Sequence, residues 1–353
     1  MEIGGDFWLD EIEYNNDINK IFFEFGKDNK FVMSGRTAID VAIQDILQEK
    51  KIRNVYFPSY VCESMIQPFK DRGINIEFYN VYFDNTLKYD IDTDYDCDIF
   101  FAMNYFGYSS TNMEKYIEQF KSRGIIVIED FTQSLLSKKA FYNKSDYVIC
   151  SLRKWFPIAT GGIVSKLHSN FNINFNNFDF NEEVVKNKKI AMNKKYECIK
   201  NNTLDEYKSE FLNLYKKSNL AIKEEYVNKL MDNESINYIL NVNLNKIKTL
   251  RKNNVKTIYE NFDIKKYKPL IKDYKENEDC LLYLPIYIEK NKLDKLNEKI
   301  YENKFYCPSH WPIDRKINDL FENELSLVCD QRYTEEQISE KIILLNKFLE
   351  EIK

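Results

Sequence analysis

The sequence predicts an α/β protein with a large, mainly parallel sheet flanked by helices and a small α+β unit at the C-terminal end. Between residues 31 and 150, short apolar runs alternate with segments whose apolar residues recur at helical spacing. This alternation is typical of a parallel sheet with helices on both faces. The last hundred residues read as the smaller unit, and we divide the chain into a large domain, 1–245, and a small domain, 246–353.

The predicted elements follow from the same patterns, taken in chain order. Strands are expected at 31–33, 55–57, 74–79, 99–103, 125–128 and 147–150, and helices at 38–49, 61–72 and 112–123. Residues 181–261 are charged and helical in pattern, with a capping-box pattern at 203–206. In the small domain we expect strands at 281–288, 305–307 and 325–328, a helix at 290–302, and a last helix opened by a capping box at 334–337.

Composition excludes several classes of protein. The formal net charge of the 353 residues is −5, so no basic face for nucleic acid is expected. No apolar run approaches the ~18 residues that a membrane span needs. The seven scattered cysteines form no CxxC pair, and with no signal peptide ahead of them they read as reduced thiols of a cytoplasmic protein. Only two histidines are present, which argues against a histidine-rich metal site.

Polar residues gather at the ends of the predicted strands. Ser34-Gly35, Asn104, Asp130 and Ser151–Lys154 all stand where a strand ends. In a parallel sheet, ligands bind beyond the carboxyl ends of the strands, so these residues mark a candidate site. The Ser-Gly-Arg-Thr turn at 34–37 opens a helix, where backbone N–H groups and the helix dipole favour an anion, although a plain N-cap is the simpler explanation.

One combination of residues points to a particular chemistry. Lys154 follows a buried strand and precedes Gly161-Gly162, and Asp130 and Gln133 follow the previous strand. Taken alone, Lys154 would be as easily a surface lysine. Together with the helix opening at Ser34, these are the parts that pyridoxal phosphate (PLP) chemistry needs. A lysine forms an imine with the cofactor, a carboxylate keeps the pyridine nitrogen protonated, and a helix N-terminus holds the phosphate.

The sequence resembles the DegT/DnrJ/EryC1/StrS family of PLP-dependent sugar aminotransferases of fold type I. The resemblance rests on SGRTAI (34–39), FPSYVC (57–62), NYFG (104–107), IEDFTQS (128–134) and SLRKWFPIATGG (151–162) and, more weakly, on SHWP (309–312) and CDQRY (329–333). It implies transfer of an amino group, usually from glutamate, to a nucleotide-linked keto sugar for polysaccharide or glycan biosynthesis.

The resemblance also implies roles for individual residues. Lys154 would carry the cofactor and shuttle protons, Asp130 would pair with the pyridine nitrogen, and Gln133 would contact the ring hydroxyl. Gly35, Arg36 and Ser151 would surround the phosphate. The family commonly has threonine where Arg36 stands.

At the position of the family's stacking aromatic this chain has Cys62, so Tyr60 or Tyr105 is expected to stack on the ring. In the small domain, His310 and Arg332 are candidate substrate contacts. The alternatives are a packed turn histidine and a structural ion-pair partner.

Two other functions stay open at this point. The chain could be a non-catalytic member that keeps the fold as a binding or regulatory protein, or an aminotransferase for a keto compound that is not a sugar. Retention of Lys154, Asp130 and Gln133 favours an active enzyme, and the presence of Lys154 disfavours a branch of the family that replaces this lysine by histidine for dehydration. The resemblance further implies a homodimer, in which the aromatic segment from Phe171 to Phe180, or the helices after it, would reach the partner subunit.

Overall fold

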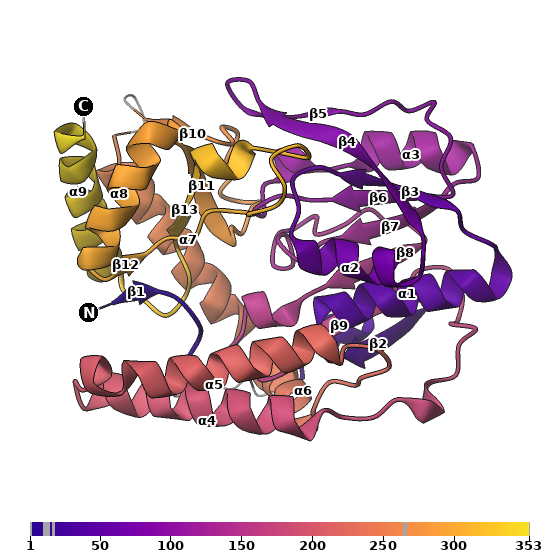
Figure 1. The fold of residues 1–353 in the computed structure, drawn as a ribbon, viewed down its shortest axis with the longest axis horizontal. Helices are drawn as coiled ribbons and strands as arrows, with labels where there is room; N and C mark the ends of the chain where they lie inside the picture. Colours follow the sequence, from indigo (N-terminus) through magenta and orange to yellow (C-terminus); the bar gives the residue numbers. More distant parts are fainter. Residues whose placement is uncertain (1, 10–14, 16–17, 264–266, 353) are drawn as a thin grey trace.

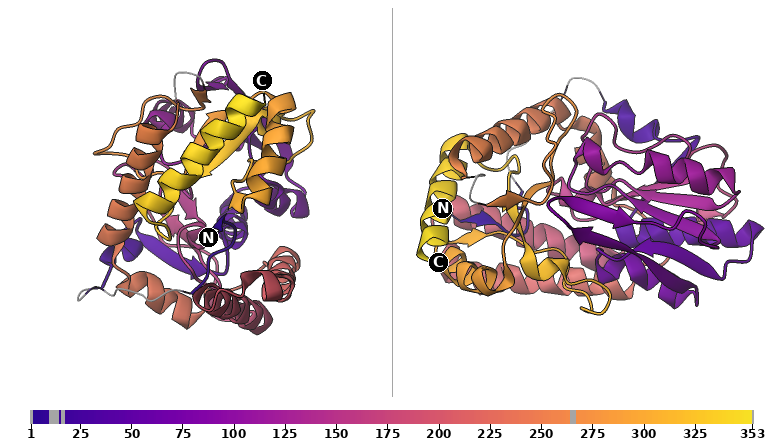
Figure 2. Two further views of the ribbon diagram at one scale, coloured as in Figure 1. Left: turned by 90° about the vertical axis from the view of Figure 1, so that its left-hand side faces the viewer. Right: turned by 90° about the horizontal axis from the view of Figure 1, so that it is seen from above.

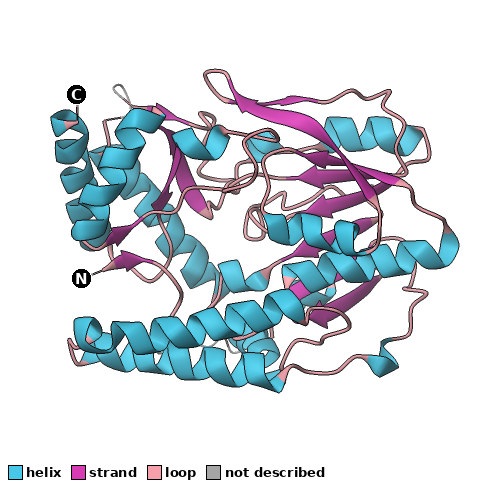
Figure 3. Ribbon diagram, in the orientation of Figure 1, coloured by secondary structure: helices cyan, strands magenta, loops and turns pink. Residues whose placement is uncertain are grey.

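The computed structural model describes residues 2–9, 15, 18–263 and 267–352. Figure 1 shows a large unit built on a wide sheet, a smaller unit at the opposite end of the molecule, and a pair of long helices beneath both. Figure 3 shows the same arrangement by type of element.

The large unit is organised around an eight-stranded sheet. Its strands lie in the order β2 (Asp28–Val32), β9 (Gly162–Lys166), β8 (Tyr147–Cys150), β7 (Ile126–Asp130), β6 (Ile99–Met103), β3 (Asn54–Pro58), β4 (Asn75–Phe83) and β5 (Leu87–Asp90). The pairs from β8 across to β4 are parallel, while β2, β9 and β5 join by antiparallel pairing. The prediction of a mainly parallel sheet is confirmed.

Three helices connect the parallel strands. They are α1 (Gly35–Glu49), α2 (Glu63–Asp71) and α3 (Glu114–Ser122). Strands β6 and β7 are almost entirely buried, which explains why they read as continuous apolar runs. Since the parallel strands point the same way, the residues that follow β7 and β8 meet at one edge of the sheet, next to the start of α1.

The helical region forms two parts. Helices α4 (Glu182–Lys200) and α5 (Leu204–Glu224) pack side by side along the lower edge of the molecule in Figure 1. Helix α6 (Asn233–Asn241) and helix α7 (Leu244–Asn261) lead into the small unit. The capping box predicted at Thr203 is wrong, because the Thr203 side chain makes no capping hydrogen bond.

The small unit contains a three-stranded antiparallel sheet of β10 (Lys268–Pro269), β11 (Tyr283–Tyr287) and β13 (Glu324–Val328). Helices α8 (Lys290–Glu302) and α9 (Glu335–Glu351) pack together, and α9 also packs on α7, as the side views of Figure 2 show. The capping box predicted at Thr334 is confirmed.

The start of the chain belongs spatially to the small unit. Strand β1 (Ile3–Gly4) pairs in parallel with β12 (Phe305–Tyr306), and Figure 1 shows the N-terminus beside the C-terminal elements. A division of the chain at residue 245 assigns these first residues to the large domain, whereas they pair with β12 of the small unit, about three hundred positions away along the chain.

Candidate active site

The turn that carries Lys154 is fixed by its own sequence. After β8 the chain makes one turn of 3-10 helix, Leu152–Lys154. Leu152 is fully buried in an apolar cluster, whereas Arg153 and Lys154 keep accessible surface. Burial of the leucine thus turns the two basic side chains of this segment toward open space.

The strand that carries Asp130 is locked to this turn by Thr132. The Thr132 backbone N–H donates to Asp130 Oδ1 over 2.7 Å, and the Ser151 N–H donates to Thr132 Oγ1 over 2.9 Å. The Trp155 indole N–H donates to the Thr132 carbonyl oxygen over 2.6 Å. These bonds fix the ends of β7 and β8 relative to each other. Sequence patterns do not single out Thr132, because two of its hydrogen-bond partners lie 19 and 23 positions away.

Two glycines let the start of α1 approach the same turn. Ser34 caps the helix by accepting a hydrogen bond from the Thr37 N–H. A Cβ atom on Gly35 would lie 2.9 Å from the Cβ of Ser151, and one on Gly162 would lie 2.3 Å from the Ser34 carbonyl oxygen. Any side chain at either position would push the helix N-terminus away from the Lys154 turn.

These elements enclose a cavity of about 240 Å³. Of the residues predicted from the sequence, those that line the cavity are Lys154, Asp130, Gln133, Ser151, Gly35 and Arg36. Ser34, Cys62, Thr132 and Arg153 also line it, as does Asn219 of α5. The structure therefore brings together residues from five separate stretches of the chain.

The polar groups of this cavity fit a PLP molecule. Burial raises the pKa of Asp130, and this rise is opposed by the hydrogen bonds from Thr132 and by the charge of Lys154. A protonated pyridine nitrogen beside Asp130 would further favour its carboxylate form. Gln133 accepts a hydrogen bond from the Phe106 N–H, but its Nε2 is buried and has no partner within the described part of the chain. A buried donor without a partner is costly, and a ring hydroxyl oxygen would satisfy it.

Neither of the predicted stacking tyrosines lies at the wall of this cavity. Tyr60 is 1% exposed and stacks on Tyr105, with ring centroids 5.6 Å apart. The residues that line the cavity include Cys62, and not Tyr60 or Tyr105. Asn104 also points elsewhere, because its side-chain amide donates to Glu129 and to the Ala140 carbonyl oxygen.

A second, larger cavity of about 660 Å³ meets the first. Both cavities are lined by Ser151, Arg153, Lys154 and Asn219. The larger one extends between α4, α5, the N-terminal segment and the small unit. The Lys154 Nζ atom also lies 5.7 Å from the centre of the Trp311 ring, which belongs to the small unit. Lys154 thus lies where the two cavities meet, close to the small unit.

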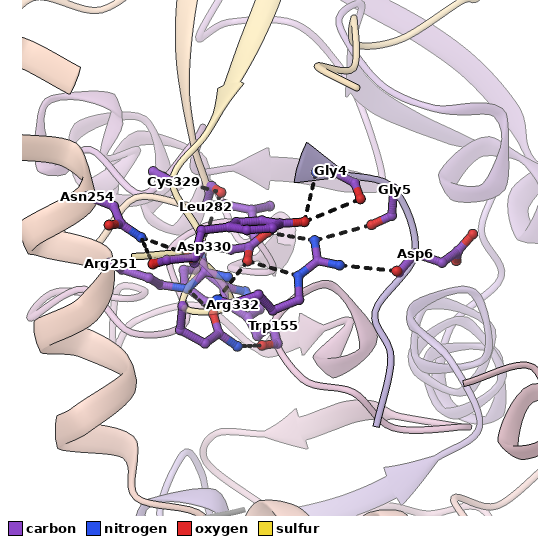
Figure 4. Close-up of polar contacts among 12 residues, drawn as sticks. Gly4, Gly5, Asp6, Trp155, Arg251, Asn254, Leu282, Cys329, Asp330 and Arg332 are labelled. Atoms are coloured by element: carbon purple, nitrogen blue, oxygen red, sulfur yellow. Dashed lines mark hydrogen bonds and ion pairs between the residues drawn. The ribbon is translucent and has the colours of Figure 1, made fainter. Parts of the chain in front are cut away.

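Arg332 occupies the structural role that was one of its two expected roles. It forms a bidentate ion pair with Asp330, with atoms 2.9 and 2.7 Å apart, and donates to the Gly5 and Asp6 carbonyl oxygens (Figure 4). Its charge holds the pKa of the buried Asp330 below its usual value, against the effect of burial. Arg332 lines the larger cavity, yet its Nε, Nη1 and Nη2 atoms all donate to the protein.

His310 is packed in the small unit and lines neither cavity. Its Nδ1 lies 3.0 Å from Ser326 Oγ, and its backbone N–H donates to the buried Glu324. This environment matches the packed turn histidine that was the alternative to a substrate contact.

The aromatic segment from Phe171 to Phe180 packs on its own subunit. Phe171 lies against Tyr147, Phe175 contacts Phe171 and Phe178, and the Phe171 N–H donates to Asp28. These contacts lie at the β2–β9 edge of the sheet. Most of these phenylalanines thus pack on their own chain, while Phe180 stays 45% exposed, and a contribution of the segment to a partner subunit remains a prediction. The helices that follow the segment line the cavities of their own chain.

The described residues were also compared with what a metal site and a membrane-spanning helix require. Within residues 2–9, 15, 18–263 and 267–352, no group of three or more His, Cys, Asp or Glu side chains is arranged to hold a metal ion. None of the helices described above combines the length and the apolar character that crossing a bilayer requires.

Comparison with known proteins gives structural matches only. No protein-family model matches the sequence, and no curated protein sequence matches it. Among solved structures, the chain is similar to Helicobacter pylori PseC, an aminotransferase involved in the biosynthesis of pseudoaminic acid. The TM-score is 0.63 at 13% identity, over 96% of this chain and 94% of that one.

Two further structures are similar over most of their length. The E coli GDP-4-keto-6-deoxy-D-mannose-3-dehydratase, solved with bound hydrated PLP, matches at a TM-score of 0.58 and 16% identity, over 94% of this chain and 89% of that one. The aminotransferase TlmJ from Streptoalloteichus hindustanus matches at a TM-score of 0.59 and 9% identity, over 92% of this chain and 86% of that one. Identities this low show the fold and leave the reaction to be argued from the site. The chain has the fold of the fold-type-I PLP-dependent transferases, as its sequence predicted.

Proposed function

We propose that this protein is a PLP-dependent aminotransferase that transfers an amino group, from glutamate, to a nucleotide-linked keto sugar. The observation that carries the proposal is the small cavity, where Lys154, Asp130 and the unpaired Gln133 amide meet the N-terminus of α1. The combination is specific: a nucleophilic amine, a buried carboxylate, a free donor and an anion site are the groups that PLP requires.

Each residue has a defined task in this proposal. The cofactor supplies an electron sink that stabilises negative charge on the substrate carbon during amino transfer. Lys154 attaches the cofactor and moves a proton on and off that carbon, and Asp130 keeps the pyridine nitrogen protonated. Gln133 holds the ring oxygen, while Ser34, Gly35, Arg36 and Ser151 surround the phosphate. Thr132 positions both Asp130 and the Lys154 turn through its hydrogen bonds.

The larger cavity is the proposed place of the substrate, because it meets the cofactor cavity at Lys154 and is lined by both units. The similar structures include enzymes described by the sugars or sugar nucleotides they handle, which supports a sugar substrate. We further propose that the enzyme is a homodimer in the cytoplasm. The seven cysteines, all unpaired, suit a reducing compartment.

Reduction with borohydride tests the proposal. The purified protein should show a visible absorbance band with PLP, and borohydride followed by peptide mapping should place the label on Lys154. Glutamate should bleach the band, because it converts the cofactor to its aminated form. A label on another lysine would refute the assignment.

The same experiment separates the alternative functions. A band that no amino donor bleaches would favour a binding or regulatory protein. If the band is bleached, the aminated enzyme should be mixed with a panel of nucleotide-linked keto sugars and with simple keto acids. Recovery of the band with keto acids alone would favour the non-sugar substrate.

A further inference from the structure

Arg153 is a cation without a partner at the meeting point of the two cavities. It forms no hydrogen bond or ion pair with any residue that the structure describes, and its Nε atom is buried. Burial lowers its pKa to about 10, well below the value of a free guanidinium. Several other basic residues on the walls of the larger cavity, Lys188, Lys195 and Arg332 among them, do have carboxylate partners. A guanidinium N–H that is buried without a partner is costly, and an anionic ligand would satisfy it.

Arg36 also forms no ion pair with a described residue, and it lies close to Arg153. Among the residues that the structure describes, its buried Nε has no partner, and its hydrogen bond runs from Nη1 to the Ile222 carbonyl oxygen over 3.2 Å. The nearby charge of Asp6 opposes the effect of burial on the pKa of Arg153, and the charge of Arg36 adds to that effect, as expected of two guanidinium groups close together. Neither forms an ion pair within the described part of the chain. An anion between them would remove the repulsion and satisfy both.

The start of α1 adds to this site. Gly35 and Arg36 are the first residues of a 15-residue helix, whose first N–H groups have no partner inside the helix. Gly35 brings these groups against Ser151, two positions before Arg153. A phosphate dianion suits two guanidinium groups and a helix N-terminus better than a carboxylate does, because it has more oxygen atoms and more charge.

We propose that Arg153 and Arg36 form a two-arginine phosphate site at the N-terminus of α1, and that this site holds the phosphate of the cofactor. The inference rests on the proposed function, since it assigns the phosphate to PLP. It adds Arg153, a residue that stands beside Lys154 in the sequence, to the residues that bind the cofactor. It also places both cations of the site in the same chain as Lys154.

A comparison of PLP with pyridoxal, which lacks the phosphate, tests the role of Arg153. Dissociation constants should be measured by absorbance for the wild type, R153M, R153K and R36M. Loss of one arginine should weaken the binding of PLP by about 10- to 100-fold and leave the binding of pyridoxal unchanged. R153K should lie between the wild type and R153M, because it keeps the charge and loses the planar fork. Thermal melting should first show that each variant is folded.

K188M is the matched control, because Lys188 lines only the larger cavity. It should keep the wild-type preference for PLP over pyridoxal. If R153M instead binds PLP as the wild type does but loses affinity for UDP, Arg153 belongs to the substrate cavity and the proposal is wrong. An equal change for PLP and pyridoxal would also overturn it.

Inorganic phosphate separates this inference from the proposed function. Titration of the cofactor-free protein, followed by ³¹P NMR, should show binding that R153M weakens. Binding that depends on Arg153 in a protein whose Lys154 is never labelled by PLP would refute the aminotransferase and keep the anion site. Labelling of Lys154 together with phosphate binding that is insensitive to R153M would keep the enzyme and refute the site.

Discussion

At the scale of single residues, the neighbouring carboxylates Glu129 and Asp130 lie in different surroundings because their side chains point in opposite directions. Glu129 and Asp130 both belong to β7, and successive side chains of a strand point to opposite faces of the sheet. Asp130 lines the smaller cavity. Glu129 accepts hydrogen bonds from Asn104, the Tyr142 N–H and Ser145 on the other side. The sequence points to Asp130, and the structure separates its surroundings from those of Glu129.

Substitution of Asp130 should affect turnover far more than cofactor binding. In D130N the pyridine nitrogen loses the carboxylate that keeps it protonated, so we expect kcat to fall by about 10²- to 10³-fold with some PLP still bound. Steady-state kinetics and the absorbance of bound PLP measure the two effects. E129Q is the control and should keep the PLP band. Wild-type turnover in D130N would remove Asp130 from its assigned role.

Glu129 should make the free energy of unfolding depend on pH. Burial raises its pKa from 4.5 to about 7, despite three hydrogen bonds that lower it. Between these values the folded protein binds more protons than the unfolded chain, so stability falls as pH rises from about 4.5 to 7, by at most about 3 kcal/mol. Urea unfolding at pH 5 and pH 7.5, without added cofactor, should show a smaller pH dependence in E129Q than in the wild type. An identical dependence would contradict the assignment.

At the scale of elements, the site depends on the close approach of α1, the Lys154 turn and β9. Val32 of β2 pairs with Gly162 of β9, and the Gly161 N–H donates to the Met33 carbonyl oxygen. The start of α1 is thus held by the strand that follows the Lys154 turn. This explains why a glycine pair stands after the lysine, which the sequence could note but not explain.

Substitution of Gly162 tests this contact. In G162A the new methyl group would lie 2.3 Å from the Ser34 carbonyl oxygen, so backbone has to move, and we expect a loss of about 1–3 kcal/mol and weaker PLP binding. In G161A the nearest atom is the flexible end of the Ile158 side chain, so a smaller loss is expected. Urea unfolding of the two variants compares them. Equal stability would mean that the contact at Ser34 relaxes without cost.

At the scale of the whole molecule, a few long-range contacts hold the N-terminal segment and the small unit together. Besides the β1–β12 pair, the Gly4 N–H donates to the Tyr333 hydroxyl, and Glu2 pairs with Lys195 and Lys208. Arg332 bonds the same segment on one side and Asp330 on the other, as Figure 4 shows. These contacts form one side of the larger cavity.

Arg332 should therefore be needed for stability. R332M would leave the buried Asp330 without its partner, and we expect a loss of about 3–5 kcal/mol in unfolding free energy. Replacing Asp330 by Asn in the same protein should recover part of the loss, because no charge is then left unpaired. Thermal and urea unfolding measure this. A stable R332M protein with a raised KM would instead return Arg332 to the substrate role.

The proposed homodimer is tested by sedimentation. We expect a mass of two chains at low micromolar concentration, since the resemblance implies a dimer, and large apolar residues such as Leu212 and Leu220 stay exposed on α5. A fully active monomer would contradict this proposal. Phe171, Phe175 and Phe178 should not be part of the interface, because they already pack on their own chain.

The sequence by itself determined the type of sheet and the edge at which the site lies. Parallel strands end at one edge, so the residues that follow β7 and β8 had to meet near the start of α1, and Asp130, Gln133, Ser151 and Lys154 do so. Local patterns carry this information because strand and helix periodicity arise between residues close in sequence.

Only the tertiary structure decided which side chains lack partners and which distant segments complete the site. Long-range packing leaves Arg153 without an ion pair among the described residues and brings Asn219 of α5 to the smaller cavity. It also places Tyr60 behind the wall of that cavity and pairs the first residues with β12. Strand β5 and the antiparallel edges were missed for the same reason. Such contacts join residues far apart along the chain, and neither hydrophobic period nor local capping specifies which of the many exposed faces will meet.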